Sequence, residues 1–556
     1  MFGGSMNAQH VLRCNASNSI DGLATCMSNA PEPIHVRSFM GFSGPLPPER
    51  FNMARYVIAH AAKQTPDKVA LIVYDRADAS APAEQWQFAE IETAILRIAA
   101  ALVARGLAKG DRVVIRLDNT SAYAFFFFGA IAAGLVPLAT STHLSEDEAN
   151  FLIMDSGARA VALASHLPRA GLATTIDIIS AEDVAEMISN SVRGDYADTL
   201  ADDPANKVYT SGPPANPKGV LPAQRAAWGR RPMYQGWYGI SDADRMLHAG
   251  AFNWTFTLGS GLTAPWANGA TSIIFTGEKS PDIWPHLIAR TGATLFAAVP
   301  GVYRQMLKYA DAKALRAMHT LRHGLMAGES PPEGLFEQWH EATGRSLHEA
   351  LGMSEISTYV STAPGVPRML GTVGRPQPGR CIAILPEEGG ETPLAAGEAG
   401  LLAVHMSDPG LMLGYWKRPN EEAEVRRGPW FIGGDFASMN EDGYITHLGR
   451  TNDIMKAMGY RVAPQEVEAV LARHPDVGEV ACAEQRVRDG VSIIAAYVVP
   501  VAQGVIPDGE QIIAYAAEQL APYKCPRAVY IVQHLPRTAN GKVLRRALRP
   551  LDTPAA

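Results

Sequence analysis

Apolar and polar positions follow two different periods along most of the chain. Residues 91–107 repeat apolar side chains at helical spacing, whereas 112–116 and 160–163 are short apolar runs typical of buried strands. A further helix is expected over residues 122–134 and a further strand over 271–275. Helices that alternate with short apolar strands predict an α/β fold with a largely parallel sheet.

The pattern changes twice toward the C-terminus. Between residues 380 and 446, short strands separated by glycine and proline predict a small antiparallel, barrel-like β piece. After residue 450, helical and strand patterns predict a compact α+β unit of about a hundred residues. We therefore expect a flexible N-terminal extension over 1–46, a large domain of layered α/β sheets over 47–449, a small mobile α+β domain over 450–549 and a tail over 550–556.

The composition narrows the classes of function. The net charge is −7 and 19% of residues are charged, so the chain lacks the overall basic field that holds nucleic acid or anionic lipid. Its five cysteines form no CxxC pair and no Cys/His cluster with metal-ligand spacing. That usage fits a reducing compartment. We expect a cytoplasmic protein without a membrane span or nucleic-acid partner, and we leave homo-oligomerisation open.

A block rich in glycine and hydroxyl side chains follows the strand-like residues 208–209. It reads Thr210-Ser211-Gly212-Pro213-Pro214-Ala215-Asn216-Pro217-Lys218-Gly219. Small residues expose backbone N–H groups and the lysine adds an ammonium, a combination that can surround phosphate. The block does not follow the GxxxxGK[ST] pattern of a P-loop. A proline-rich surface loop would account equally well for the block in isolation.

Two acidic blocks carry further chemistry. In Gly352-Met353-Ser354-Glu355, a carboxylate beside a hydroxyl can hold Mg²⁺, which needs only one or two protein carboxylates when phosphate supplies other oxygens. Asp435 follows Gly433-Gly434 and can accept both hydroxyls of a ribose. Taken singly, the two side chains could be a solvated glutamate and a turn aspartate.

Two basic blocks complete the series. The first is Gly449-Arg450-Thr451-Asn452-Asp453, and the second is Pro536-Arg537-Thr538-Ala539-Asn540-Gly541-Lys542. Asn-Gly favours a tight turn, from which Lys542 would project. A lysine ammonium suits phosphate oxygens or a developing carboxyl–phosphate bond.

The order and spacing of these blocks resemble the adenylate-forming (AMP-binding) superfamily, which contains acyl-CoA synthetases, adenylation domains of peptide synthetases and luciferases. The resemblance extends from about Phe51 to Arg549. It implies a two-step reaction that uses ATP, Mg²⁺ and coenzyme A. A carboxylate first attacks the α-phosphate of ATP, and a thiol then attacks the acyl-adenylate after the small domain has rotated.

The resemblance also implies roles for individual residues, with Lys542, Glu355 and Arg461 as the catalytic group. The implied roles are a phosphate loop (Thr210, Ser211, Gly212, Lys218), an adenine-side turn (Gly328, Glu329, Ser330), a hydroxyl and Mg²⁺ ligand (Ser354, Glu355), a ribose clamp (Asp435, Arg450), a hinge (Asn452), a thiol-tunnel glycine (Gly459), a phosphate-contacting arginine (Arg461) and the adenylation lysine (Lys542).

The branch of the family and the class of acid follow from a few positions. Asn253 stands where amino-acid-activating relatives carry an aspartate, and a neutral amide cannot offset a buried ammonium. Gly352 stands where acetate-specific relatives carry a tryptophan. A glycine at this position would leave room for a larger acyl group. We therefore expect an acid–CoA ligase for an aromatic or medium-chain acid. The pocket candidates are Phe252, Asn253, Trp254, Val299, Pro300 and Gly352, although core packing explains Phe252 and Trp254 equally well.

The sequence departs from the family most clearly at Pro213-Pro214-Ala215, where relatives carry Thr-Thr-Gly or Ser-Ser-Gly. Two prolines remove two backbone donors, and both hydroxyls are lost. The alternative hypothesis is therefore a catalytically impaired relative that binds nucleotide or acyl ligand without efficient turnover.

Overall fold

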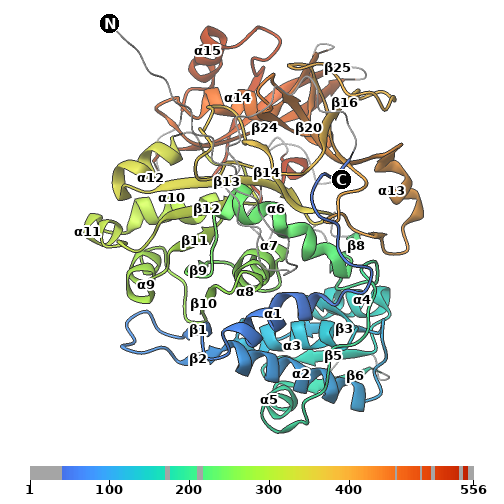
Figure 1. Cartoon of the computed structure of the whole chain (residues 1–556). Helices are drawn as coiled ribbons and strands as arrows, with labels where there is room; N and C mark the ends of the chain where they lie inside the picture. The colour runs from blue at the N-terminus through green and yellow to red at the C-terminus, as the bar shows by residue number, and fades with distance from the viewer. Residues whose placement is uncertain are drawn as a thin grey trace, which may run out of the picture.

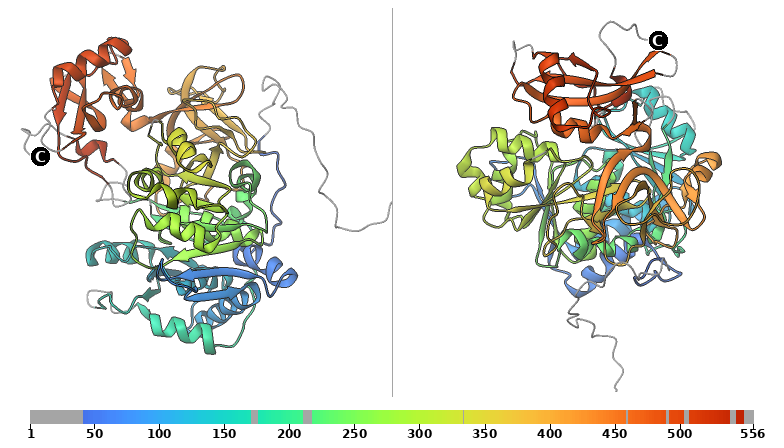
Figure 2. Two further views of the ribbon diagram at one scale, coloured as in Figure 1. Left: turned by 90° about the vertical axis from the view of Figure 1, so that its left-hand side faces the viewer. Right: turned by 90° about the horizontal axis from the view of Figure 1, so that it is seen from above.

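The computed structural model describes residues 41–169, 176–209, 217–332, 334–457, 460–488, 491–502, 507–537 and 543–548. An N-terminal parallel sheet, a large mixed sheet and an antiparallel sheet form the main body, and an α+β unit follows them (Figure 1). The antiparallel sheet and the C-terminal unit lie at one end of the molecule, and the N-terminal sheet lies at the other (Figures 1 and 2).

The N-terminal sheet has four parallel strands in the order β4-β3-β5-β6. Almost every residue of α3 is buried, which explains why its four consecutive phenylalanines show no amphipathic period. The elements of this part are α1 (Met53–Gln64), α2 (Phe88–Ala104), β3 (Arg112–Arg116), α3 (Ser121–Ala132), β4 (Val136–Ala139), α4 (Glu146–Ser156), β5 (Ala160–Leu163), β6 (Asp177–Ser180) and α5 (Ala181–Asn190).

The large sheet has nine strands in the order β15-β14-β13-β12-β11-β9-β10-β1-β2. The six inner strands of this sheet run parallel, and they are β1, β9, β10, β11, β12 and β13. Strands β2, β14 and β15 add antiparallel edges. Side chains alternate between two apolar cores, with Leu247 of β9 on one face and Met246 on the other. The strands are β1 (Val69–Tyr74), β2 (Glu84–Gln87), β9 (Arg245–His248), β10 (Thr271–Phe275), β11 (Leu295–Ala298), β12 (His323–Ala327), β13 (Ser346–Met353), β14 (Ser357–Ser361) and β15 (Arg375–Pro376).

Helical segments cover both faces of this sheet. One face packs against side chains of α9 (Ile283–Thr291), α10 (Pro300–Tyr309), α11 (Ala312–Arg316) and α12 (Leu335–Thr343). The other face packs against the segments around α6 (Arg231–Met233), α7 (Thr255–Thr257), a π-helical turn (Leu258–Thr263) and α8 (Ala264–Ala267).

The predicted antiparallel piece is a sheet of β16 (Ile382–Leu385), β17 (Ala399–His405), β20 (Trp430–Met439), β19 (Arg426–Arg427) and β21 (Ile445–Arg450). A separate small sheet joins β7 (Val208–Tyr209), β8 (Gly219–Leu221) and β18 (Gly414–Tyr415), while α13 spans Pro419–Glu424. Because β7 and β8 flank the glycine- and hydroxyl-rich block, this small sheet fixes both ends of the block.

The C-terminal unit has apolar cores of its own. Its two clusters contain only residues from Met455 onward, whereas the clusters of the main body end at Ile445. Its elements are β22 (Met455–Ala457), β23 (Tyr460–Val462), α14 (Pro464–Leu471), β24 (Val477–Arg488), β25 (Val491–Pro500), α15 (Gly509–Gln519) and β26 (Ala528–Ile531). The expected boundaries at 46, 449 and 549 remain predictions.

The predicted fold class is confirmed. The strands expected at residues 112–116, 160–163 and 271–275 are β3, β5 and β10 with the same bounds. The helices expected over 91–107 and 122–134 are α2 and α3, whose ends differ from the expected ranges by a few residues. In the part of the chain that the structure describes, no helix is both long enough and apolar enough for a membrane crossing.

A buried ion pair joins the antiparallel sheet to the rest of the main body. Nη1 of Arg380 lies 2.8 and 2.7 Å from the two carboxylate oxygens of Asp408, and both side chains are almost completely inaccessible. Nη2 donates to the carbonyls of Gly229 (2.8 Å) and Thr358 (3.2 Å), and Nε donates to Gln377 (3.0 Å). One guanidinium therefore connects four segments that are distant in sequence.

We predict that Asp408→Asn lowers the free energy of unfolding by about 3–5 kcal/mol, because it leaves a buried guanidinium without its counter-charge. Asp78→Asn is the matched control, since Asp78 pairs with Arg76 on the exposed surface. Urea unfolding followed by tryptophan fluorescence measures both variants. Equal, small shifts for the two would contradict the structural role of the buried pair.

Candidate active site

The candidate residues meet at the carboxyl edge of the large sheet. Strand β9 ends just before the segment 249–254, β11 is followed by Val299, β12 by Gly328, and β13 by Ser354 and Glu355. These four strands are neighbours in the order β13-β12-β11-β9, and all run parallel. Ligands of open α/β sheets bind at this edge, because consecutive loops converge there.

The acyl-side and adenine-side candidates approach one another closely. Gly328 has φ +101°, and a Cβ atom at this position would lie 3.6 Å from Cγ1 of Val299 and 3.8 Å from Cη2 of Trp254. The positive φ favours glycine, which also lets the loop lie against both side chains. Asn253 beside Trp254 is half-buried, Glu329 is half-buried, Ser330 is exposed, and Pro300 is buried in the first turn of α10.

Tyr415 connects the loop lysine to the expected Mg²⁺ ligand. Its hydroxyl donates to Oε1 of Glu355 at 2.7 Å, and Nζ of Lys218 lies 5.1 Å from its ring centroid. Burial and the Glu355 carboxylate raise the pKa of Tyr415, so its phenol stays a neutral donor. Tyr415 reaches this place because β18 pairs with β8, one residue after Lys218.

The residues around Glu355 fit a magnesium ion that is completed by phosphate oxygens. The described residues contain no group of three or more His, Cys, Asp or Glu side chains that could hold a metal ion by themselves. Mg²⁺ keeps several waters and uses one or two carboxylates together with substrate phosphates. Glu355 and the neighbouring Ser354 hydroxyl suit such a site, in which the ion would neutralise phosphate charge.

Asp435 and Arg450, the expected ribose clamp, lie opposite each other on β20 and β21. Nε of Arg450 is 3.1 Å from Oδ1 of Asp435, and Nε2 of His447 is 3.0 Å from the same oxygen. The Asp435 carboxylate raises the pKa of Arg450. Asp435 is 1% exposed, so the clamp holds its carboxylate rigidly, and Gly434, which precedes it within β20, has φ +80°.

A buried lysine lies at the base of the glycine- and hydroxyl-rich block. Nζ of Lys207 donates to the hydroxyl of Tyr209 (2.6 Å), lies 3.5 Å from Asp155 and sits 4.5 Å from the ring centroid of Trp416. Burial lowers the pKa of Lys207 to about 7. This cluster attaches β7 to α4, so it positions the start of the block.

Several expected site residues cannot be placed in this way. Thr210, Ser211, Gly212, Gly459 and Lys542 lie outside the described residues, as do Pro213, Pro214 and Ala215. For Asn452, after β21, and Arg461, in β23, only the backbone is described.

Two pocket candidates have surroundings that favour a packing role. Phe252 is 3% exposed and packs against Tyr123 in the N-terminal core, with ring centroids 5.6 Å apart, so core packing explains it. A Cβ atom at Gly352 would lie 2.5 Å from the carbonyl oxygen of Ser357 and 2.8 Å from Cα of Thr358. The missing side chain therefore admits the backbone of β14, and a role of Gly352 in the acyl pocket stays a prediction.

Sequence reasoning missed Tyr415, Lys207, His447 and Tyr359, whose hydroxyl lies 3.5 Å from Asp435. None of them stands in a glycine-rich block. The available signal was the aromatic pair Tyr415-Trp416, which is followed by two basic residues.

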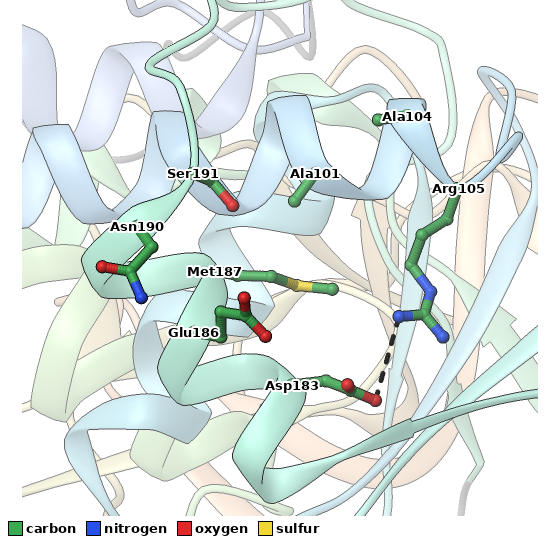
Figure 3. A pocket seen from close by; sticks show the side chains of 8 residues that line it. All are labelled: Ala101, Ala104, Arg105, Asp183, Glu186, Met187, Asn190 and Ser191. Carbon is green, nitrogen blue, oxygen red and sulfur yellow. Dashed lines mark ion pairs between the residues drawn. The ribbon is translucent and has the colours of Figure 1, made fainter.

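A shallow hollow between α2 and α5 lies apart from these residues (Figure 3). Nη1 of Arg105 lies 3.8 Å from Asp183 at its rim. None of the side chains that line the hollow is a candidate site residue, and we assign it no role. The lining residues are Ala101, Ala104, Arg105, Asp183, Glu186, Met187, Asn190 and Ser191.

Comparison with known families decides the classification. Residues 58–416 match the family described as AMP-binding enzyme, and residues 466–542 match the AMP-binding enzyme C-terminal domain. This chain belongs to the AMP-binding enzyme family. The resemblance inferred from the ordered blocks is thereby confirmed.

Individual members of the family are similar over most of their length. The benzoate–CoA ligase of Thauera aromatica is 30% identical over 462 residues, which cover 80% of this chain and 86% of the relative. The 3-hydroxybenzoate–CoA ligase of Aromatoleum sp. (strain CIB) is 29% identical over 482 residues, covering 84% and 91%.

Solved structures of AMP-binding enzymes share the fold. A crystal structure of ATP-bound MatB from Rhodopseudomonas palustris has a TM-score of 0.82 at 25% identity and covers 90% of this chain and 98% of that one. A benzoate CoA ligase from Burkholderia xenovorans LB400 has a TM-score of 0.77 at 27% identity, covering 89% and 99%.

We predict that Gly352→Ala lowers the free energy of unfolding by about 1–3 kcal/mol, because its methyl group must displace the backbone of β14. Gly301→Ala is the control, since nothing lies within 4 Å of a Cβ atom at that helical position. Thermal unfolding measures both. A Gly352→Ala protein that is as stable as wild type but prefers shorter acids would contradict the packing role and support a role of Gly352 in the acyl pocket.

Proposed function

We propose that this AMP-binding enzyme is an ATP-dependent carboxylic acid–CoA ligase that acts on an aromatic acid. The observation that carries the proposal is the convergence of Lys218, Tyr415 and Glu355 with the Asp435–Arg450 pair around the carboxyl edge of one sheet. This arrangement supplies a cation, a carboxylate for a metal and a sugar-binding carboxylate, which together suit MgATP.

The first step needs relief of negative charge, because a carboxylate must attack a phosphorus that already bears oxyanions. An oxygen of the acid bonds to the α-phosphorus, and the bond to the β-phosphate oxygen breaks to release pyrophosphate. Lys218 would offset charge on the phosphates, and the resemblance assigns the same task to Arg461 and Lys542. Mg²⁺ held at Glu355 would screen the phosphate oxygens.

The second step transfers the acyl group to coenzyme A. The thiol sulfur bonds to the carbonyl carbon, AMP leaves with the electron pair of the acyl–phosphate bond, and the thiol proton passes to solvent. AMP is a good leaving group, whereas a free carboxylate would have to expel an oxide or hydroxide ion, which is a poor one. We propose that the C-terminal unit rotates about Asn452 between the steps, so that Gly459 borders the thiol path after Lys542 has withdrawn.

The choice of an aromatic acid rests on the relatives and on the local side chains. The two relatives described above are named for benzoate and 3-hydroxybenzoate. In this chain, Trp254 and Phe256 have ring centroids 6.3 Å apart, and Trp254 approaches the Gly328 turn. Flat apolar side chains at this position favour an aromatic ring over a flexible chain. Asn253 remains the reason to disfavour an α-amino acid.

The altered loop residues 213–215 motivate the alternative of an impaired enzyme, but the named ligase relatives do not favour it. Restoring Thr-Thr-Gly there would recover up to about 10²–10⁴-fold in rate if two charge-assisted contacts were missing.

We predict that benzoate-type acids support exchange of labelled pyrophosphate into ATP, because the adenylation step is reversible. The measurement uses the full chain with MgATP and a panel of aromatic, aliphatic and amino acids. Exchange should require magnesium and should fall strongly in Glu355→Gln. The ligase proposal is wrong if ATP binds measurably and yet no acid of the panel supports exchange.

We predict that Lys542→Ala loses adenylation but retains thioester formation from pre-formed acyl-adenylate, because the lysine acts on the phosphates only in the first step. Single-turnover assays of each half-reaction separate the two. Lys524→Ala is the matched control, since Lys524 pairs with Glu466 in the same unit. Equal loss of both half-reactions in Lys542→Ala would contradict the assigned role.

A further inference from the structure

A buried arginine without a carboxylate partner lies next to the proposed acyl site. Arg230 is 8% exposed. Its Nη1 donates to Oγ of Ser357 and its Nη2 to the hydroxyl of Tyr238, both at 2.7 Å, while Nε is buried without a hydrogen-bond partner. Among the described residues, no aspartate or glutamate lies within 4.0 Å of this guanidinium.

The absence of a counter-charge at this depth is energetically unfavourable. A guanidinium stays charged at every relevant pH, and two hydroxyl dipoles solvate it only in part. Arg380 shows how the same chain buries such a group, because Asp408 neutralises it. A buried arginine that lacks this compensation is able to pair with an anion that binds from outside the chain.

The surroundings of Arg230 connect it to the acyl-side residues. A Cβ atom at Gly259 would lie 2.4–2.5 Å from three guanidinium atoms, so only glycine lets the π-helical turn Leu258–Thr263 lie flat against the charge. That turn directly continues the segment that carries Trp254 and Phe256. Within the same turn, Ser260 hydrogen-bonds Tyr238 at 2.9 Å.

The opposite side of the guanidinium is formed by the segment after Glu355. Ser357 has φ 76°, a left-handed conformation that is uncommon for serine. This backbone presents Oγ to Arg230, and its carbonyl faces Gly352. Arg230 therefore lies between the aromatic segment and the turn that carries the expected Mg²⁺ ligand.

We propose that Arg230 binds a second carboxylate of the acid, so that the substrate class is an aromatic dicarboxylic acid. The inference rests on the proposed ligase function and extends it. The reacting carboxylate lies at the nucleotide end, near Lys218 and Glu355, and the second one pairs with the guanidinium, whose planar fork can hold two carboxylate oxygens. Arg230 is a specificity-determining residue and takes no part in bond making.

The test compares benzoate, the three benzene dicarboxylates, the monomethyl ester of the preferred dicarboxylate and 4-hydroxybenzoate in pyrophosphate exchange. We expect the wild-type enzyme to prefer one dicarboxylate over benzoate and over its monomethyl ester, which lacks the second charge, by at least about 100-fold in kcat/KM, as a matched buried charge pair allows. The ester has nearly the same shape without the charge, so it isolates the ion pair.

Arg230→Gln removes the charge but keeps an amide donor for Ser357 and Tyr238. We expect it to abolish the preference for the dicarboxylate while benzoate exchange changes by less than about threefold. Arg231→Gln is the matched control, because Arg231 is the exposed neighbour that packs on Trp228, and it should keep the preference. Melting temperatures of both variants report any loss of folding separately.

The outcomes distinguish the two proposals. Exchange with benzoate and dicarboxylates at equal efficiency, or a uniform loss with all acids in Arg230→Gln, would leave the ligase function standing and show that Arg230 is only structural. A preference for 4-hydroxybenzoate over every dicarboxylate would overturn the second-carboxylate assignment. Exchange with no acid at all would instead overturn the ligase function itself.

Discussion

The Arg380–Asp408 pair is the contact on which the geometry of the site depends. It fixes the antiparallel sheet against Gly229, which precedes Arg230, and against Thr358 of β14. The chain after Asp408 then leads directly to β18 and Tyr415. Gly229 and Gly410 approach so closely that a Cβ atom on Gly229 would lie 2.3 Å from Cα of Gly410. The segment that follows Asp408 also reaches Glu355 directly, because the backbone N–H of Met412 donates to the Glu355 carbonyl at 2.7 Å.

Parallel strands supply the second constraint. Because β9, β11, β12 and β13 all end at the same edge, residues separated by a hundred positions in sequence lie along one edge of the sheet. Tyr415 comes from a different sheet and links two of the chemical groups, the Lys218 ammonium and the Glu355 carboxylate. The proposed nucleotide end of the site is thus built from two different sheets.

Two buried arginines show how the same side chain serves different ends. Arg380 has its charge neutralised within the chain by Asp408 and connects segments that are distant in sequence. Arg230 has only hydroxyl partners among the described residues, so its burial remains unfavourable until an anion arrives. Structures keep such unfavourable groups chiefly at functional sites. The contrast lies in the partners alone, since both guanidiniums are deeply buried.

Local patterns were enough to identify the strands β3, β5 and β10, the α/β class and the blocks that contain Lys218, Glu355, Asp435 and Arg450, because apolar period and glycine spacing are properties of short segments. Lys207 and Arg230 carry no such local signal, and the sequence around Gly352 does not show what lies against it. A register shift between Leu351 and Gly352 brings the β14 backbone against that glycine. Only the tertiary structure decides which distant segments approach a residue, because strand pairing and packing, rather than neighbours in sequence, determine what a side chain touches.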